Sequence, residues 1–149
     1  MTTRLMIMRH ATTGWATFGQ SDHDRELTDY GREETPKMAK ALQEMDWIPD
    51  LALVSSSTRT RETFSLLMPA PHEIRDEIYR ASLDTLLSFV DEIDEGKTTL
   101  IVGHNPGCEL LISTLSGVFH EVPPATCALF SNQDGNWVLE KVLRTAGLD

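Results

Sequence analysis

The sequence predicts an α/β fold, a three-layer αβα sandwich around a mostly parallel central sheet with an antiparallel edge strand. Two observations lead to this prediction. Short apolar runs alternate along the chain with segments whose apolar residues recur at helical spacing, an order that is typical of βαβ units. A hairpin signal near the end of the chain adds an antiparallel pair at the edge of the sheet. The apolar runs lie at residues 4–8, 51–54, 99–103 and 127–130, and the hairpin joins 127–131 to 136–142 through a polar turn at 132–135.

Helical spacing is found in three segments between these runs. The first helix is expected over Thr28–Met45, with Pro36 either kinking it or starting its main body. The second helix fits Arg59–Met68, where prolines follow, and the third fits Leu83–Ile93, which carries one apolar stripe. These stripes predict helix faces that pack against the sheet.

Two of the predicted strands end in a histidine. The run at 4–8 leads into Arg9 and His10, and the run at 99–103 leads into His104, Asn105 and Pro106. Asparagine followed by proline is typical of a helix start, so His104 is expected beside a positively polarised helix end. Because ligands bind at the carboxyl ends of strands in an open parallel sheet, we expect both histidines in one pocket.

The composition predicts one domain over residues 1–149. Its apolar stretches are far shorter than the roughly 20 residues that cross a bilayer, and no secretion signal is recognisable. The net charge of −10 argues against nucleic acid and anionic membranes as partners. Cys108 and Cys127 match no zinc or CxxC spacing and are expected to be buried free thiols. Together these features predict a cytoplasmic protein.

Arginines beside the first histidine and in a serine-rich loop suggest phosphate chemistry. Arg9 next to His10 would let a guanidinium neutralise phosphoryl oxygens while the imidazole attacks phosphorus. The run 55–58 offers hydroxyls and backbone amides at a helix start, directly before Arg59. Each feature also has a plain structural interpretation, as a surface pair at a strand end and as serines that only cap a helix.

Taken together, these motifs resemble the histidine phosphatase superfamily, and in particular its short, SixA-like phosphohistidine phosphatase branch. The motifs are Arg9-His10-Ala11, Arg59-Thr60-Arg61-Glu62-Thr63 and Gly103-His104-Asn105-Pro106, and the segments 22–28 and 104–111 extend the similarity. The resemblance implies a phosphoglycerate mutase-like fold. It also implies a metal-independent phosphatase that needs no cofactor and works through a covalent phosphohistidine.

The resemblance assigns roles to four residues. It makes His10 the nucleophile, Arg9 and Arg59 the phosphate clamp, and His104 the second pocket histidine, so a phosphate or sulfate ion is expected to bind among them. The substrate is expected to be a phosphorylated protein histidine. A small phosphate ester is the first alternative, and a noncatalytic module that only recognises phosphate is the second.

The chain departs from the superfamily pattern in two places. The serine run at 55–58 lacks the proline that commonly precedes the pocket arginine. An acidic proton donor cannot be aligned within 76–80, which leaves Glu77 and Asp24 as candidates. A missing acid would favour phosphoramidates, because an alkoxide needs a proton donor whereas an imidazole can depart already protonated.

Several other residues have structural interpretations. His23 lies between two aspartates, yet no second cluster completes a metal site, so a polar loop is expected, and the pattern leaves open whether it borders the pocket. Trp15 and Phe18 either line the entrance or pack under the first loop. His72 and His120 are expected in exposed loops. Trp47 and Trp137 are expected to pack in the core or at the edge of the sheet.

Overall fold

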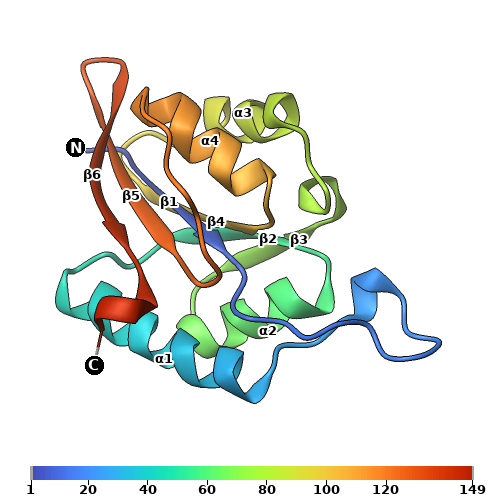
Figure 1. The fold of residues 1–149 in the computed structure, drawn as a ribbon. Helices are drawn as coiled ribbons and strands as arrows, with labels where there is room; N and C mark the ends of the chain where they lie inside the picture. Colours follow the sequence, from blue (N-terminus) through green and yellow to red (C-terminus); the bar gives the residue numbers. More distant parts are fainter. Residues whose placement is uncertain (1, 149) are drawn as a thin grey trace.

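One six-stranded sheet forms the centre of the computed structural model, which describes residues 2–148 (Figure 1). The strand order is β3-β2-β4-β1-β5-β6. The first four strands pair in parallel, whereas β5 runs antiparallel to β1 and β6 antiparallel to β5. The predicted fold class is therefore confirmed. The strands are β1 (Arg4–Arg9), β2 (Leu51–Ser55), β3 (His72–Arg75), β4 (Thr98–Gly103), β5 (Cys127–Gln133) and β6 (Asn136–Leu143).

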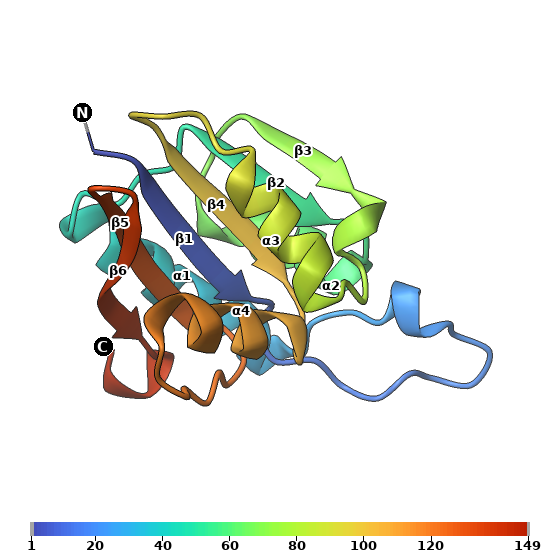
Figure 2. The same cartoon turned by 90° about the horizontal axis from the view of Figure 1, so that it is seen from above.

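Helices cover both faces of the sheet, with α1 and α2 on one face and α3 and α4 on the other (Figures 1 and 2). Side chains of β1 alternate between the two layers, because successive residues of a strand point to opposite faces. Met6 and Met8 pack toward α1 and α2, while Leu5 and Ile7 pack toward α3 and α4. The helices are α1 (Asp29–Glu44), α2 (Thr58–Leu67), α3 (Leu83–Asp91) and α4 (Gly107–Ser116), with short 3₁₀ turns η1 (Asp22–Asp24), η2 (Asp76–Ile78) and η3 (Thr145–Gly147).

Helix α1 corrects one of the two alternatives expected for Pro36, namely that the main body of the helix starts there. The helix begins at Asp29, and Pro36 lies within it. Thr28 caps the start by accepting a hydrogen bond from the Gly31 amide at 3.1 Å. The buried face already includes Gly31 and Glu34, so packing against the body of the protein fixes the first turns despite the proline.

One further strand and the start of one helix differ from the sequence prediction. Strand β3 was not predicted, and His72, expected in a loop, opens it as an exposed residue. An edge strand with exposed side chains lacks the apolar pattern that marks a strand in sequence. Helix α4 begins at Gly107, one residue after Pro106. Asn105 still satisfies the helix start, because its Oδ1 accepts the Glu109 amide at 3.2 Å.

Other expectations agree with the structure. Cys108 and Cys127 are buried free thiols, and burial raises the pKa of Cys108 to about 12. Trp47 lies in the core, and the β5–β6 hairpin turns through Asp134 and Gly135, both with positive φ. Within residues 2–148, no helix is both long and apolar enough to span a bilayer.

Gly31 holds helix α1 against the loop that follows the first histidine. A Cβ at this position would overlap the backbone carbonyl oxygen of Thr12. We expect Gly31→Ala to destabilise the protein by about 2 kcal/mol or more, because neither backbone can yield cheaply. Urea unfolding measures the effect. Gly147→Ala is the control, since nothing lies within 4 Å of the added carbon; equal stability of the two variants would contradict this role.

Candidate active site

A pocket of about 570 Å³ opens where β1, β2 and β4 end. His10 follows β1, His104 follows β4, and Arg59 lies in the first turn of α2, directly after β2. All three line the pocket, together with Arg9. The imidazole rings of His10 and His104 meet edge to face, with centroids 5.3 Å apart. Four side chains from three separate segments of the chain therefore surround one cavity.

The His10 ring is oriented by its own neighbour in the chain. Its Nδ1 lies 2.8 Å from the backbone carbonyl oxygen of Ala11. Because a carbonyl can only accept, Nδ1 must carry the proton, and the lone pair resides on Nε2. Burial lowers the pKa of His10 to about 4, and the charges of Arg9 and Arg59 act in the same direction. His10 is thus a neutral imidazole near pH 7, as a nucleophile must be.

His104 is held from the other side of the pocket. Its Nε2 lies 2.7 Å from the Ser55 hydroxyl, whereas its Nδ1 is buried without a hydrogen-bond partner among residues 2–148. Burial, together with the neighbouring His10 and Arg59, lowers the pKa of His104 to about 3. A ring nitrogen left unsatisfied beside a cavity suits a polar ligand, since an unpaired buried polar group is costly.

The serine loop is braced without the proline that the superfamily pattern contains. Ser57 caps α2 by accepting a hydrogen bond from the Thr60 amide. The Thr60 hydroxyl in turn donates to the backbone carbonyl of Ser55 at 2.7 Å. Ser55 and Thr60 are fully buried. These bonds fix the end of β2 and, with it, the start of the helix that carries Arg59.

The two predicted arginines are anchored through backbone carbonyls. Arg9 donates from Nη1 to the carbonyl of Val122 at 3.0 Å, and its buried Nε has no partner among the described residues. Arg59 donates from Nη1 to the backbone carbonyl of Asp22 at 2.7 Å and from Nη2 to its side chain at 3.1 Å. Arg25 and Arg80 also line the pocket, so four guanidinium groups surround it.

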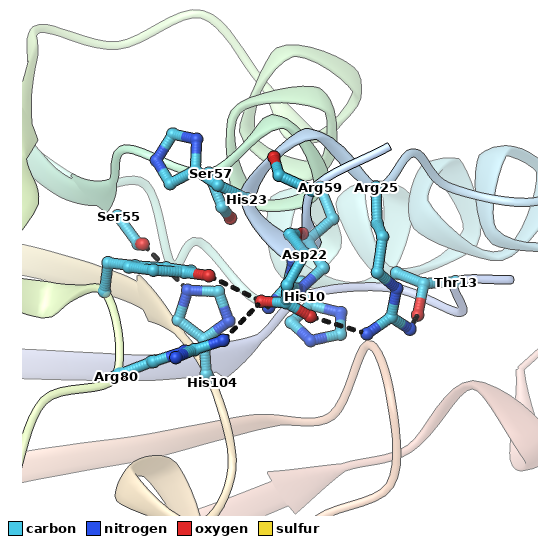
Figure 3. A network of polar contacts seen from close by, with 12 residues as sticks. His10, Thr13, Asp22, His23, Arg25, Ser55, Ser57, Arg59, Arg80 and His104 are labelled. Carbon is cyan, nitrogen blue, oxygen red and sulfur yellow. Dashed lines mark hydrogen bonds and ion pairs between the residues drawn. The ribbon is translucent and has the colours of Figure 1, made fainter. Parts of the chain in front are cut away.

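Asp22 lies at the centre of this cation cluster (Figure 3). Its carboxylate accepts hydrogen bonds from the Tyr79 hydroxyl at 2.5 Å, from Arg25 at 2.9 Å and from Arg59 at 3.1 Å, and pairs with Arg80 at 3.5 Å. The hydrogen bond from Tyr79, followed by those from Arg25 and Arg59, holds the pKa of the Asp22 carboxyl well below its usual range. Asp22 is the only carboxylate among the described residues that line the pocket.

The two proton-donor candidates from the sequence lie elsewhere. Glu77 pairs with Arg75 at 2.7 Å, and about half of its side chain is exposed. The Asp24 side chain is 68% exposed. Neither residue is among the described residues that line the pocket. They belong to the short 3₁₀ turns η1 and η2; in η1 it is Asp22 that lines the pocket, and Tyr79, which follows η2, donates a hydrogen bond to Asp22.

The residues whose position the sequence left open are now placed. His23 hydrogen-bonds the Ser56 hydroxyl at 3.0 Å and stacks edge to face on Tyr79, outside the pocket lining. Trp15 and Phe18 are exposed; they neither pack under the loop nor belong to the described residues that line the pocket.

Sequence reasoning assigned no role to Asp22, Arg25, Tyr79 or Arg80. The available signal was their position within the two segments already compared with the superfamily, 22–28 and 76–80.

Comparison with known proteins decides the family. The model of the histidine phosphatase superfamily (branch 1) matches residues 5–79. The chain belongs to this superfamily. An uncharacterized chloroplastic protein of Arabidopsis thaliana is 30% identical, over 90% of this chain and 68% of the relative.

Solved structures identify the branch of the histidine phosphatase superfamily. A putative phosphohistidine phosphatase SixA from Agrobacterium tumefaciens superposes with a TM-score of 0.88 and 28% identity, over 95% of this chain and 97% of the other. A second putative SixA, from Nakamurella multipartitia, has a TM-score of 0.85 and 24% identity, over 97% and 96%. The chain is therefore a SixA-like histidine phosphatase, and the expected enzyme class, a phosphatase hydrolase, is confirmed.

Proposed function

We propose that this chain is a metal-independent phosphohistidine phosphatase that removes the phosphoryl group from a histidine of a phosphorylated protein. One observation carries the choice of substrate. Among the described residues that line the pocket, the single carboxylate, Asp22, is held ionised by a tyrosine and three arginines. The pocket therefore offers no carboxylic acid to protonate a departing alkoxide.

The first step of the reaction fits the orientation of His10. Its Nε2 lone pair attacks phosphorus, the P–N bond of the substrate breaks, and the phosphoryl group passes to His10. Arg9 and Arg59 neutralise the phosphoryl oxygens as charge spreads over them. Two buried nitrogens lack a hydrogen-bond partner among the described residues, Nδ1 of His104 and Nε of Arg9. Each would donate a hydrogen bond to an oxygen of the phosphoryl group.

The second step uses the proton that His10 keeps throughout. Water attacks phosphorus, the bond from His10 Nε2 to phosphorus breaks, and inorganic phosphate leaves. Because Nδ1 holds its proton in the hydrogen bond to Ala11, His10 departs as a neutral imidazole and is ready for the next cycle. No further acid is needed at this step either.

The histidine of a phosphohistidine substrate can also leave without an external acid. Its ring can carry a proton on the nitrogen that is not phosphorylated, so it also leaves as neutral imidazole. An alkyl phosphate has no such nitrogen, and a positioned acid would be worth about 10²- to 10⁴-fold in rate. The pocket chemistry therefore favours P–N over P–O substrates. The two unpaired buried thiols fit activity in a reducing compartment such as the cytoplasm.

The test compares matched leaving groups in buffer with a chelator. Purified protein is given free phosphohistidine, phosphoserine and an aryl phosphate, and each kcat/KM is divided by the uncatalysed rate. We expect phosphohistidine to exceed phosphoserine by at least about 100-fold. The aryl phosphate should fall between them, because a phenolate leaves without protonation. Comparable acceleration of phosphoserine and phosphohistidine would refute the proposal in favour of a small-molecule esterase.

A further inference from the structure

The loop between β1 and η1 carries an exposed aromatic pair that neither the core nor the pocket uses. Trp15 is 91% exposed and Phe18 is fully exposed, more than any other large apolar residue described. The segment 11–21 contains no charged residue, although the chain as a whole has a net charge of −10. Figures 1 and 2 show this loop projecting well beyond the body of the protein. Exposed aromatic side chains without charged neighbours are typical of interaction sites.

Hydrogen bonds hold the loop in a defined shape. Arg25 donates from Nε and Nη2 to the backbone carbonyl of Gly14 at 3.0 and 2.8 Å. The Gln20 amide closes a turn on the Thr17 carbonyl at 2.9 Å, and the Gln20 side chain donates to the Asp24 carbonyl at 3.0 Å. The two aromatic side chains are therefore presented from an organised loop. An ordered loop loses less conformational entropy when a partner binds to it.

The two ends of the loop are walls of the active-site pocket. Thr13 at one end and Asp22 at the other both line the cavity, and Arg25 connects them by bonding to each. Anything that covers the aromatic pair while its phosphoryl group lies against His10 must extend from the pocket along the loop. The pocket of about 570 Å³ holds a small phosphate compound on its own. Trp15 and Phe18 are not among the described residues that line it, so a ligand that contacts both this pair and His10 must extend beyond the pocket.

We propose that Trp15 and Phe18 are the docking surface for the protein whose phosphohistidine enters the pocket, and that this partner has an apolar patch beside that histidine. This inference rests on the proposed function. Tryptophan is enriched among the residues that dominate binding energy at protein interfaces. A membrane surface is the competing partner, in which case the segment would act as an interfacial membrane loop. Such loops combine aromatic with basic residues, whereas this loop has no cation and the chain is acidic.

The test combines a double variant with a pair of substrates. Wild type and Trp15→Ala/Phe18→Ala are compared on two peptides phosphorylated on one central histidine, flanked by leucines in one peptide and by serines in the other. We expect wild type to prefer the leucine peptide by at least about 10-fold in kcat/KM, and the double variant to lose that preference. Phe119→Ala is the matched control, an exposed aromatic beyond the far end of α4, and it should keep the preference.

Free phosphohistidine separates this inference from the proposed function. Wild-type turnover of free phosphohistidine tests the proposed function alone, and the double variant should match it. Three results would overturn the docking surface. The first is that wild type uses both peptides equally well. The second is that the double variant loses as much activity on free phosphohistidine as it loses on the leucine peptide. The third is that the protein binds vesicles through the aromatic pair and shows no preference between the peptides.

Discussion

Replacing His10 with alanine should lower the turnover of phosphohistidine by about 10⁴-fold or more, because no other described group in the pocket offers a lone pair in its position. The Nε2 of His10 is unprotonated because Nδ1 carries the proton in the bond to Ala11, and His10 lines the pocket together with four arginines. Steady-state kinetics on free phosphohistidine measures the effect.

The control for this variant is anion binding. Because Arg9 and Arg59 remain, the His10→Ala protein should still bind an oxyanion such as tungstate within about 10-fold of wild type, as shown by calorimetry. A variant that retains more than about a hundredth of wild-type turnover would show that another group attacks phosphorus.

Replacing Arg59 with alanine should be the second most damaging change, with a loss of about 10²- to 10³-fold in kcat/KM. Arg59 is 6% exposed, so its guanidinium acts in a poorly hydrated setting where its charge is weakly screened. Its guanidinium also donates hydrogen bonds to the backbone carbonyl and to the side-chain carboxylate of Asp22. The same kinetic assay measures the change.

Two variants separate the role of Arg59 from general effects of charge. Arg61 lies on the same helix, is exposed, hydrogen-bonds Ser56 and Thr58 and is not among the described residues that line the pocket, so Arg61→Ala should stay within about 3-fold of wild type. Arg59→Lys keeps the charge but loses the planar fork and should recover only part of the activity. An equal loss in the Arg59 and Arg61 alanine variants would contradict a phosphate clamp.

The sheet and the convergence of the two histidines could be predicted because each depends on a strong local signal. Apolar runs mark the four buried strands, and the rule for carboxyl ends of parallel strands brings His10 and His104 together. Strand β3 escaped prediction since its side chains are mostly exposed and only its backbone pairs with β2. The start of α1 beside Thr28 agrees with the prediction, but the alternative that its main body begins at Pro36 is wrong, because packing of Gly31 against Thr12 outweighs the local effect of proline.

The outer part of the site could not be predicted for a different reason. Asp22 and Tyr79 meet at 2.5 Å although they come from separate 3₁₀ turns, η1 and η2, or their immediate ends. Short 3₁₀ turns have no periodicity, so sequence gives no direction for their side chains. Asp24 and Glu77, the candidate acids, each lie only two positions in the sequence from Asp22 and Tyr79, respectively.

Transfer of the phosphoryl group to Nε2 of His10 is the central step of the proposed reaction. Protein quenched in base during turnover of phosphohistidine preserves a phosphorus–nitrogen bond, and peptide mapping then locates it. We predict a phosphoryl group on His10 alone, absent from the His10→Ala variant. A phosphoryl group on His104 or any other residue, or an enzyme that turns over without carrying one, would contradict it.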